Sequence, residues 1–392
     1  MSSTPESLVA SIRRSPLARP NAICPYSTMF PLDYPHEALA GAEPASWVLD
    51  PFCGRGTTNY AARLRGLPTV GIDTNPVAVA IAQAKLVSVT PDEIIAEART
   101  LLTGVSSPRH VPDGEFWSLC YHRDTLREVC RIREALLGEA PPPGSPDVVW
   151  LNQCDRSTAA RIALRGLMLG ILHGPLTKRL PSYLSNQMPR TYATKPVPAV
   201  RFWRRRGHEP PKVDTLALIE RRARYTFAQL PDVVPSAIRL ADSRRPEALV
   251  GVVPDAGFRW VVTSPPYFGM RFYRSDQWLR NWFLGGPDDV DYDVIAQLGA
   301  ERLESYAQGL AQVWHEVAHR CASGAYLICR FGSLPSMAYD ALETVRCTLS
   351  GAGWKIESIR SAGQPPRGRR QADQFVRPRA QVQEWDVTAI RV

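Results

Sequence analysis

The sequence predicts an α/β protein with a doubly wound, mostly parallel sheet and a largely helical inserted region. Two stretches, residues 21–90 and 236–392, alternate apolar strands with helical patterns. Such alternation is typical of a parallel sheet with helices on both faces. The intervening residues 91–235 lack this spacing and contain proline-rich turns. We therefore expect one catalytic α/β domain, formed by the two outer stretches, with the middle segment inserted into it.

The first stretch predicts two strands and two helices. Apolar runs at residues 46–49 and 69–72 have the length of buried strands. A helical pattern follows each of them, at residues 57–65 and 76–86. This order predicts two neighbouring parallel strands.

The second stretch predicts the rest of the sheet. Apolar runs at residues 259–262, 324–328 and 355–359 indicate buried strands, and residues 384–390 indicate a final one. A helical pattern at residues 337–350 precedes the third of these runs.

Composition favours a globular protein with a polyanionic partner. Hydrophobic residues make up 44% of the 392 residues, and the formal net charge is +9. No apolar run approaches the length of about 20 residues that a membrane-spanning helix needs, and the first twenty residues lack the apolar core of a secretory signal. The eight cysteines form no CxxC pair, so we expect reduced thiols, no metal site and a cytoplasmic protein.

A glycine-containing turn in residues 48–58 predicts a cofactor site. An apolar strand ends in Asp50, and Gly54 and Gly56 follow before the next helix. Glycines let a backbone pass close to a ligand, and the N-terminus of the helix favours a carboxylate. The next strand ends in Asp73, which can accept hydrogen bonds from both hydroxyls of a ribose. The pattern is not GxGxxG, so a dinucleotide is less favoured.

Upstream of this turn, residues 24–31 mix aromatic side chains with prolines. Two interpretations remain open for this segment. It can fold over one end of the cofactor, or it can simply pack on the sheet.

A second distinctive turn follows the strand at residues 259–262. There Thr263 and Ser264 lead into Pro265 and Pro266, which cannot continue a sheet ladder. The chain is therefore expected to leave the sheet in a stiff turn at the carboxyl end of a strand. In open α/β sheets this edge binds ligands.

These motifs resemble those of the DNA amino-methyltransferases, which use S-adenosylmethionine to modify cytosine N4 or adenine N6. The resemblance covers residues 21–86 and 237–392 and implies a Rossmann-like methyltransferase fold. Asp242 resembles a contact to the cofactor's adenine, and residues 26–31 resemble the segment against its methionine moiety. The implied cofactor-binding residues are Tyr26, Phe30, Asp50, Pro51, Phe52, Cys53, Gly54, Gly56, Thr57, Asp73, Asn75 and Asp242, and the implied catalytic residues are Ser264, Pro265, Pro266 and Tyr267.

The chemistry of amino methylation accounts for the residues of the second turn. The lone pair of an exocyclic amine is delocalised into the base, so the nitrogen is a poor nucleophile. The Ser264 hydroxyl and the Pro265 carbonyl can accept hydrogen bonds from the amino group and localise that lone pair. Tyr267 offers a flat face to an extruded base. Positioning then accounts for most of the rate.

The serine in the second turn favours cytosine N4 as the target, because adenine-N6 enzymes more often carry an acid or asparagine there. The cofactor motif precedes the catalytic motif, an order shared with permuted DNA enzymes and with transfer-RNA guanosine-N2 methyltransferases. We therefore expect a site-specific DNA methyltransferase acting on double-stranded DNA, with a cognate restriction endonuclease as a further partner. Adenine-N6 and guanosine-N2 methylation are the alternatives. A protein that binds the cofactor without catalysis is disfavoured by the intact turn.

The inserted segment 91–235 is a candidate target-recognition region. Residues 151–210 contain eleven Lys or Arg and two acids, a net charge that equals the +9 of the whole chain. Arg, Asn and Gln can read base edges, and aromatic rings can stack on bases. A solvated basic face over an aromatic core is the alternative. Residues 271–280 continue this mixture and are expected to line the target-base pocket or to begin a core helix. Within residues 151–210, the polar and aromatic residues that could read or stack on bases are Tyr183, Asn186, Gln187, Tyr192, Phe202 and Trp203.

One further motif indicates a different class of enzyme. Residues 315–319 match HExxH, whose two histidines bind zinc in metalloproteases. No third ligand is evident, and the segment directly precedes a predicted core strand. A zinc metalloprotease is therefore a remote alternative.

Overall fold

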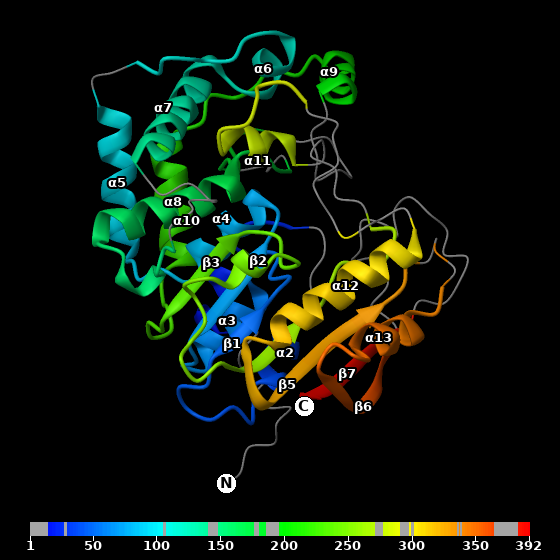
Figure 1. Ribbon diagram of the computed structural model, residues 1–392. Helices are drawn as coiled ribbons and strands as arrows, with labels where there is room; N and C mark the ends of the chain where they lie inside the picture. Colours follow the sequence, from blue (N-terminus) through cyan, green and yellow to red (C-terminus); the bar gives the residue numbers. More distant parts are fainter. Residues whose placement is uncertain are drawn as a thin grey trace.

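The computed structural model of the chain shows a seven-stranded sheet flanked by helices (Figure 1). Within the described residues, no helix is both long and apolar enough to cross a membrane. The structure describes residues 15–26, 30–104, 107–139, 148–175, 180–185, 196–270, 277–290, 298, 302–334, 337, 339–363 and 383–392.

The sheet has the strand order β3-β2-β1-β4-β5-β7-β6. Strands β1 to β5 pair in parallel, whereas β7 runs antiparallel to both β5 and β6. The chain builds outward from β1 to β3 and then returns to the other side of β1 with β4. This confirms the predicted doubly wound, mostly parallel sheet. The strands are β1 Val48–Asp50, β2 Thr69–Asp73, β3 Ser236–Leu240, β4 Phe258–Thr263, β5 Cys321–Gly332, β6 Trp354–Gly363 and β7 Glu384–Arg391.

Helices cover both faces of the sheet because successive strand residues point to opposite faces. Val48 and Val262 pack in a core with Ala62 of α3. Their neighbours Leu49 and Val261 pack instead with the residues of α12 and α13. The helices are η1 Pro16–Ala22, α2 Asp33–Ala38, α3 Thr57–Leu64, α4 Pro76–Ala84, α5 Pro91–Thr103, α6 Glu115–Cys120, α7 Arg123–Glu139, η2 Leu151–Gln153, α8 Arg156–Ile171, α9 Pro196–Arg205, α10 Thr215–Thr226, η3 Pro246–Leu249, α11 Trp278–Phe283, α12 Leu303–Ala318 and α13 Ala341–Leu349.

One predicted helix begins later than its pattern indicates. The sequence predicts a helix over residues 337–350, but α13 begins at Ala341. The side chain of Asp340 accepts a hydrogen bond from the Glu343 amide at 2.9 Å and caps the helix there.

The helices α5 to α10 gather on one side of the sheet (Figure 1) and share a core with α4. The glycines of α8 make this packing close. A Cβ at Gly166 would collide with Ala84, and a Cβ at Gly170 would collide with the Ile23 carbonyl. The division into a catalytic domain and an inserted region stays a prediction, because one continuous core joins α8 to α4.

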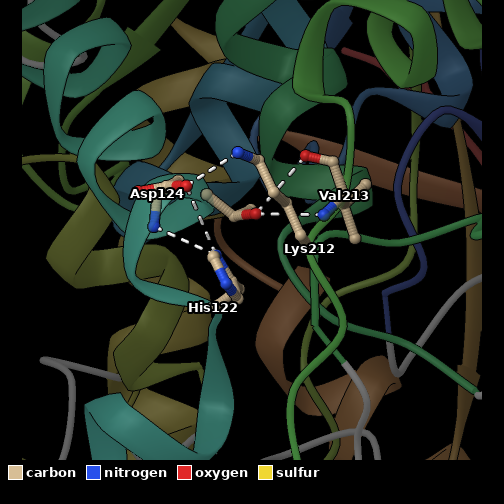
Figure 2. A network of polar contacts seen from close by, with 5 residues as sticks. His122, Asp124, Lys212 and Val213 are labelled. Carbon is tan, nitrogen blue, oxygen red and sulfur yellow. Dashed lines mark hydrogen bonds and ion pairs between the residues drawn. The ribbon is translucent and has the colours of Figure 1, made fainter.

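Polar contacts tie the chain before α10 to the start of α7. Figure 2 shows Lys212 reaching Asp124, and the Lys212 ammonium donates to the Asp124 carboxylate at 2.7 Å. The Asp124 amide donates to His122 at 3.2 Å. Val213 and Thr125 exchange two further hydrogen bonds, of 3.1 and 3.3 Å.

Arg63 of α3 is buried and joins three parts of the chain. It donates hydrogen bonds to the carbonyls of Lys85 and Val87 after α4, and to those of Pro231 and Asp232 before β3. The side chain is 1% exposed. These contacts hold α3, α4 and the entry to β3 together.

The substitution Arg63→Met is therefore expected to lower the free energy of unfolding by about 3 kcal/mol, since several carbonyls lose their donor. Urea denaturation followed by circular dichroism measures this change. The exposed Arg346→Met is the matched control, with an expected loss below about 0.5 kcal/mol. Equal losses for the two variants would contradict the role assigned to Arg63.

Candidate active site

The carboxyl ends of β1, β2 and β4 meet where the strand order reverses. Asp50 ends β1, Asp73 ends β2 and Thr263 ends β4. In doubly wound sheets ligands bind at such a reversal point. The predicted cofactor turn and the predicted catalytic turn are thus brought to one edge of the sheet.

A buried hydrogen bond joins these two turns. The Thr263 hydroxyl donates to the Asp50 carboxylate at 2.6 Å, and the Phe52 amide donates to the same oxygen at 3.1 Å. Burial raises the pKa of Asp50 to about 6, although these two hydrogen bonds favour its charged form. Asp50 therefore holds the cofactor turn against the strand that carries the catalytic turn.

The two glycines of the cofactor turn have different neighbours. Both have positive φ, 50° at Gly54 and 71° at Gly56. A Cβ at Gly56 would lie 2.7 Å from the Cβ of Ala82, so this glycine permits close packing of the turn on α4. No atom lies within 4 Å of the corresponding position at Gly54, which leaves open space over the turn. Helix α3 begins at Thr57, directly after the turn.

Asp73 lies beside the turn with acceptor capacity left over. Its carboxylate accepts hydrogen bonds from the Gly54 amide at 2.9 Å and the Asn75 amide at 2.8 Å. Burial raises the pKa of Asp73 to about 6. The Thr74 amide is a third backbone donor to this carboxylate. A carboxylate offers about four acceptor sites, so the group can still accept from a ribose.

Two aromatic residues of the upstream segment, Tyr26 and Phe30, lie near this edge of the sheet. The Asn75 side chain donates to the Tyr26 hydroxyl at 2.9 Å, which places Tyr26 beside the end of β2. Phe30 packs edge-on against Tyr34, with ring centroids 5.3 Å apart. Tyr34 in turn lies 3.8 Å beneath the guanidinium of Arg330 on β5. Tyr26 and Phe30 therefore lie at opposite ends of the edge.

Contacts from neighbouring loops hold the remaining cofactor-turn residues. The Ser243 hydroxyl donates to the Pro51 carbonyl at 2.6 Å, which ties the loop after β3 to the turn. Phe52 packs edge-on against Trp314, and Cys53 is buried.

Asp242 is already engaged in an ion pair. Its carboxylate accepts hydrogen bonds from the side chain of Arg244 at 2.6, 2.9 and 3.0 Å. In the predicted role, Asp242 would share its carboxylate between this guanidinium and the adenine amino group.

The catalytic turn is held from three sides. The Tyr306 hydroxyl of α12 donates to the Pro266 carbonyl at 2.7 Å. The Tyr267 hydroxyl donates to Glu384 of β7 at 2.8 Å, and its ring meets Phe331 of β5 edge-on. Neither the Ser264 hydroxyl nor the Pro265 carbonyl has a hydrogen-bond partner among the described residues. Both predicted acceptors are thus available.

Sequence reasoning missed Glu384 and Gly332 as parts of this site. A Cβ at Gly332 would lie 3.0 Å from Glu384 and 3.3 Å from the Tyr267 ring. The missing side chain leaves room for their contact. Nothing in the sequence pattern indicates that the first residue of β7 meets a turn more than one hundred residues upstream.

Part of the segment after the catalytic turn forms a core helix. Trp278 and Trp282 of α11 are buried, at the i, i+4 spacing that the sequence indicates. They pack with Trp117 of α6, and Trp278 also meets Phe116. Residues 271–276 lie outside the described part.

The basic segment contains both paired and exposed arginines. Arg165 is buried and donates to the Leu136 carbonyl. Arg161 pairs with Glu97 at 2.7 Å, and other partners are Glu93 for Arg156 and Glu115 for Arg204. Besides the ion-paired Arg204, the exposed arginines of α9 and the residue after it are Arg201, Arg205 and Arg206, while Lys178, Arg179, Asn186, Gln187, Arg190, Tyr192 and Lys195 lie outside the described residues.

Three aromatic residues of this segment have structural contacts. Trp203 is buried against Phe116, and Phe202 lies 4.7 Å beneath the Arg206 guanidinium. Tyr183 lies beneath Arg222 at 5.3 Å. An aromatic core, as expected for a solvated basic face, is therefore present in this segment. The exposed arginines of α9 lie on the solvent side of that helix.

The HExxH histidines lie at the end of α12. His315 and His319 are exposed, with Nε2 atoms 3.1 Å apart. No group of three or more potential metal ligands occurs in the described part of the chain.

Comparison with known proteins bears on the cofactor half of the site. Residues 11–84 match the model of the DNA methylase family. This segment contains the cofactor turn, Asp73 and Asn75. The match covers only this N-terminal part of the chain and supports an S-adenosylmethionine-dependent methyltransferase. Its methyl donor is S-adenosylmethionine, and the open space over Gly54 and the free acceptors of Asp73 fit that cofactor. The catalytic turn lies beyond the matched residues.

Solved structures of several methyltransferases are similar to the chain at low identity. A SAM-dependent methyltransferase from Methanosarcina mazei is 10% identical, with TM-score 0.34, over 93% of this chain and 98% of that one. The rRNA methyltransferase aviRa from Streptomyces viridochromogenes is 13% identical, with TM-score 0.34, over 96% and 93%. Magnesium protoporphyrin IX methyltransferase from Synechocystis PCC 6803 is 10% identical, with TM-score 0.34, over 100% and 99%. No curated protein matches the sequence. The fold assignment therefore depends on the strand order.

The raised pKa of Asp73 predicts how cofactor affinity depends on pH. Only the ionised carboxylate can accept from both ribose hydroxyls. Affinity for S-adenosylhomocysteine should thus be constant above pH about 6 and fall roughly tenfold per unit below it. Calorimetric titrations at several pH values measure this. The Asp73→Asn variant should bind S-adenosylhomocysteine weakly and should not show this fall in affinity below pH about 6. An unchanged wild-type affinity at pH about 5 would contradict the proposed contact between Asp73 and the ribose.

Proposed function

We propose that this methyltransferase transfers the methyl group to N4 of cytosine, within a short recognition sequence of double-stranded DNA. The observation that carries the proposal is the turn from Ser264 to Tyr267 at the end of β4. The Thr263–Asp50 hydrogen bond holds this turn directly beside the cofactor turn. A reacting amine and a methyl donor bound at the two turns would therefore be neighbours.

Two free acceptors of the turn activate the nucleophile, which is the N4 nitrogen of cytosine. The Ser264 hydroxyl oxygen and the Pro265 carbonyl each accept one N–H of the cytosine amino group. These contacts would localise the N4 lone pair for attack on the methyl group that S-adenosylmethionine supplies. One of the two amino protons would pass to water after the transfer. Orientation, rather than a general base, is the main contribution of the protein.

Tyr267 supports the extruded base. Its ring stacks on the cytosine while the hydroxyl remains bonded to Glu384, which fixes the orientation of the ring. Tyr306 contributes by fixing the Pro266 carbonyl, so that the backbone of the turn keeps its shape.

Three observations support DNA as the substrate. The matched family is described as DNA methylase. The serine at position 264 is the form usual in cytosine-N4 enzymes. Three exposed arginines, Arg201, Arg205 and Arg206, are available for phosphate contacts. The proposed setting is the cytoplasm, in keeping with eight free thiols, and a companion endonuclease would cleave the same sequence when it is unmethylated.

Methyl transfer from labelled S-adenosylmethionine is the central prediction. With duplex DNA as substrate, nucleoside analysis should find the label in N4-methylcytosine. Tyr267→Ala combined with Pro265→Ala should reduce the rate by at least about a hundredfold, since a 1 Å misplacement already costs that much. Glu384→Gln, which keeps a hydrogen-bond acceptor, is the matched mild variant.

The other outcomes of this experiment are equally specific. Label in N6-methyladenine would reassign the base, and label in N2-methylguanosine of transfer RNA would reassign the substrate. An absence of transfer, or full activity in the double variant, would overturn the mechanism.

The arginines of α9 should contact phosphates and not bases. Replacing Arg201, Arg205 and Arg206 by Gln should weaken duplex binding about equally for all sequences. The slope of log affinity against log salt concentration should become shallower by roughly 2 to 3. Fluorescence anisotropy of labelled duplexes measures both quantities. Arg259→Gln, near the amino end of β4, is the control, and an unchanged slope in the triple variant would remove α9 from the interface.

A further inference from the structure

Three buried basic side chains surround Cys24, and each comes from a different part of the fold. Arg55 lies in the cofactor turn, Lys85 caps the end of α4 and Arg280 lies on α11. Their exposed fractions are 6%, 0% and 6%. Arg55 donates to the Cys24 carbonyl and Lys85 to the Asn21 side chain. Arg280 donates to the carbonyl of Leu169, whose neighbour Gly170 packs so closely on the same segment that a Cβ there would lie 3.3 Å from the Cys24 Cα.

The donors of these three groups are largely unused. The Arg55 guanidinium donates one hydrogen bond, to the Cys24 carbonyl at 3.0 Å, and its buried Nε has no partner. The Lys85 ammonium donates to the Asn21 side chain at 3.0 Å. Arg280 donates to the Leu169 carbonyl at 3.2 Å. Two guanidiniums and an ammonium carry many more N–H groups than these contacts use.

No carboxylate balances this charge among the described residues. The groups that act on Arg55 and Lys85 are thiols, the Tyr26 phenol and each other. Burial therefore lowers the pKa of Arg55 to about 10 and that of Lys85 well below its usual range. Buried charges are ordinarily paired.

Arg63 shows what a purely structural buried arginine looks like in the same protein. It is as deeply buried, yet it donates four hydrogen bonds to backbone carbonyls. Arg55 has one such bond although it lies between the two glycines of the cofactor turn. This difference indicates that the Arg55 cluster is completed by an anion.

We propose that Arg55, together with Lys85 and Arg280, forms the subsite for the methionine carboxylate of the cofactor. The position agrees with the rest of the site, because Tyr26 and Asn75 continue from this cluster towards Asp73 at the ribose end. Arg55 is the direct ligand, and a guanidinium matches a carboxylate in a bidentate geometry. This inference rests on the proposed methyl-transfer function and assigns residues to one end of its cofactor.

The subsite has a consequence for the target side of the enzyme. Arg280 lies on α11, which follows the catalytic turn in the chain and carries Trp278 and Trp282 of the aromatic core. A carboxylate bound between Arg55 and Arg280 bridges the cofactor turn and this helix. Cofactor binding therefore stabilises α11, and a ligand without the carboxylate does not.

Two ligands that differ in the amino-acid moiety test the subsite. S-adenosylhomocysteine carries the carboxylate, and 5′-methylthioadenosine lacks the whole moiety. For the wild type, calorimetric titration should give much tighter binding of S-adenosylhomocysteine. Arg55→Met should lower the affinity for S-adenosylhomocysteine by about tenfold or more and change the affinity for 5′-methylthioadenosine by less than about twofold. Arg280→Met should act in the same direction.

Thermal stability without ligand separates this role from a structural one. Replacing an unpaired buried cation by an apolar side chain removes a desolvation cost, so Arg55→Met should melt at the wild-type temperature or above. Arg63→Met is the matched control and should melt earlier, with an unchanged preference between the two ligands.

Several results would overturn the proposal. If Arg55→Met weakened the binding of both ligands equally, Arg55 would not contact the carboxylate, and the cofactor assignment would remain. Failure of the wild type to bind either ligand would overturn the assignment and the subsite together. Stabilisation of the wild type by inorganic phosphate, without any preference for S-adenosylhomocysteine, would identify the occupant as a free anion.

Discussion

The buried hydrogen bond from Thr263 to Asp50 is the contact on which the site depends. It joins the last residue of β4 to the last residue of β1, across the point where the strand order reverses. A carboxylate in this position costs desolvation, which its raised pKa reflects. The cost is offset by donors from both turns. One acidic side chain thereby sets the separation between the two turns.

Small residues determine how closely the surrounding elements approach this centre. Gly56 lets the cofactor turn contact α4, Gly166 and Gly170 let α8 contact α4 and the N-terminal segment, and Gly332 leaves room for Tyr267 and Glu384. Larger side chains at these places would push the layers apart. The helical segment and the sheet consequently share one core, and the positions of Arg280 and Trp203 follow from it.

Much of the sheet could be predicted from local patterns. Buried parallel strands are continuous apolar runs, and the runs at residues 46–49, 69–72 and 259–262 were recognisable for that reason. Strand β3 was not predicted, because Ser236 and Arg239 interrupt its apolar character. The predicted start of α13 was wrong, because a capping contact from Asp340, rather than hydrophobic periodicity, determines where the helix begins.

The sequence by itself determined the α/β class, the two turns and their placement at carboxyl ends of strands, because these depend on residue types within short windows. Only the tertiary structure decided the partners of these residues. Thr263 is bonded to Asp50, Tyr267 is held by Glu384, and Arg55 donates to the Cys24 carbonyl. These pairings join residues far apart in the chain, and the packing of helices and strands brings them together. No local pattern encodes such distances.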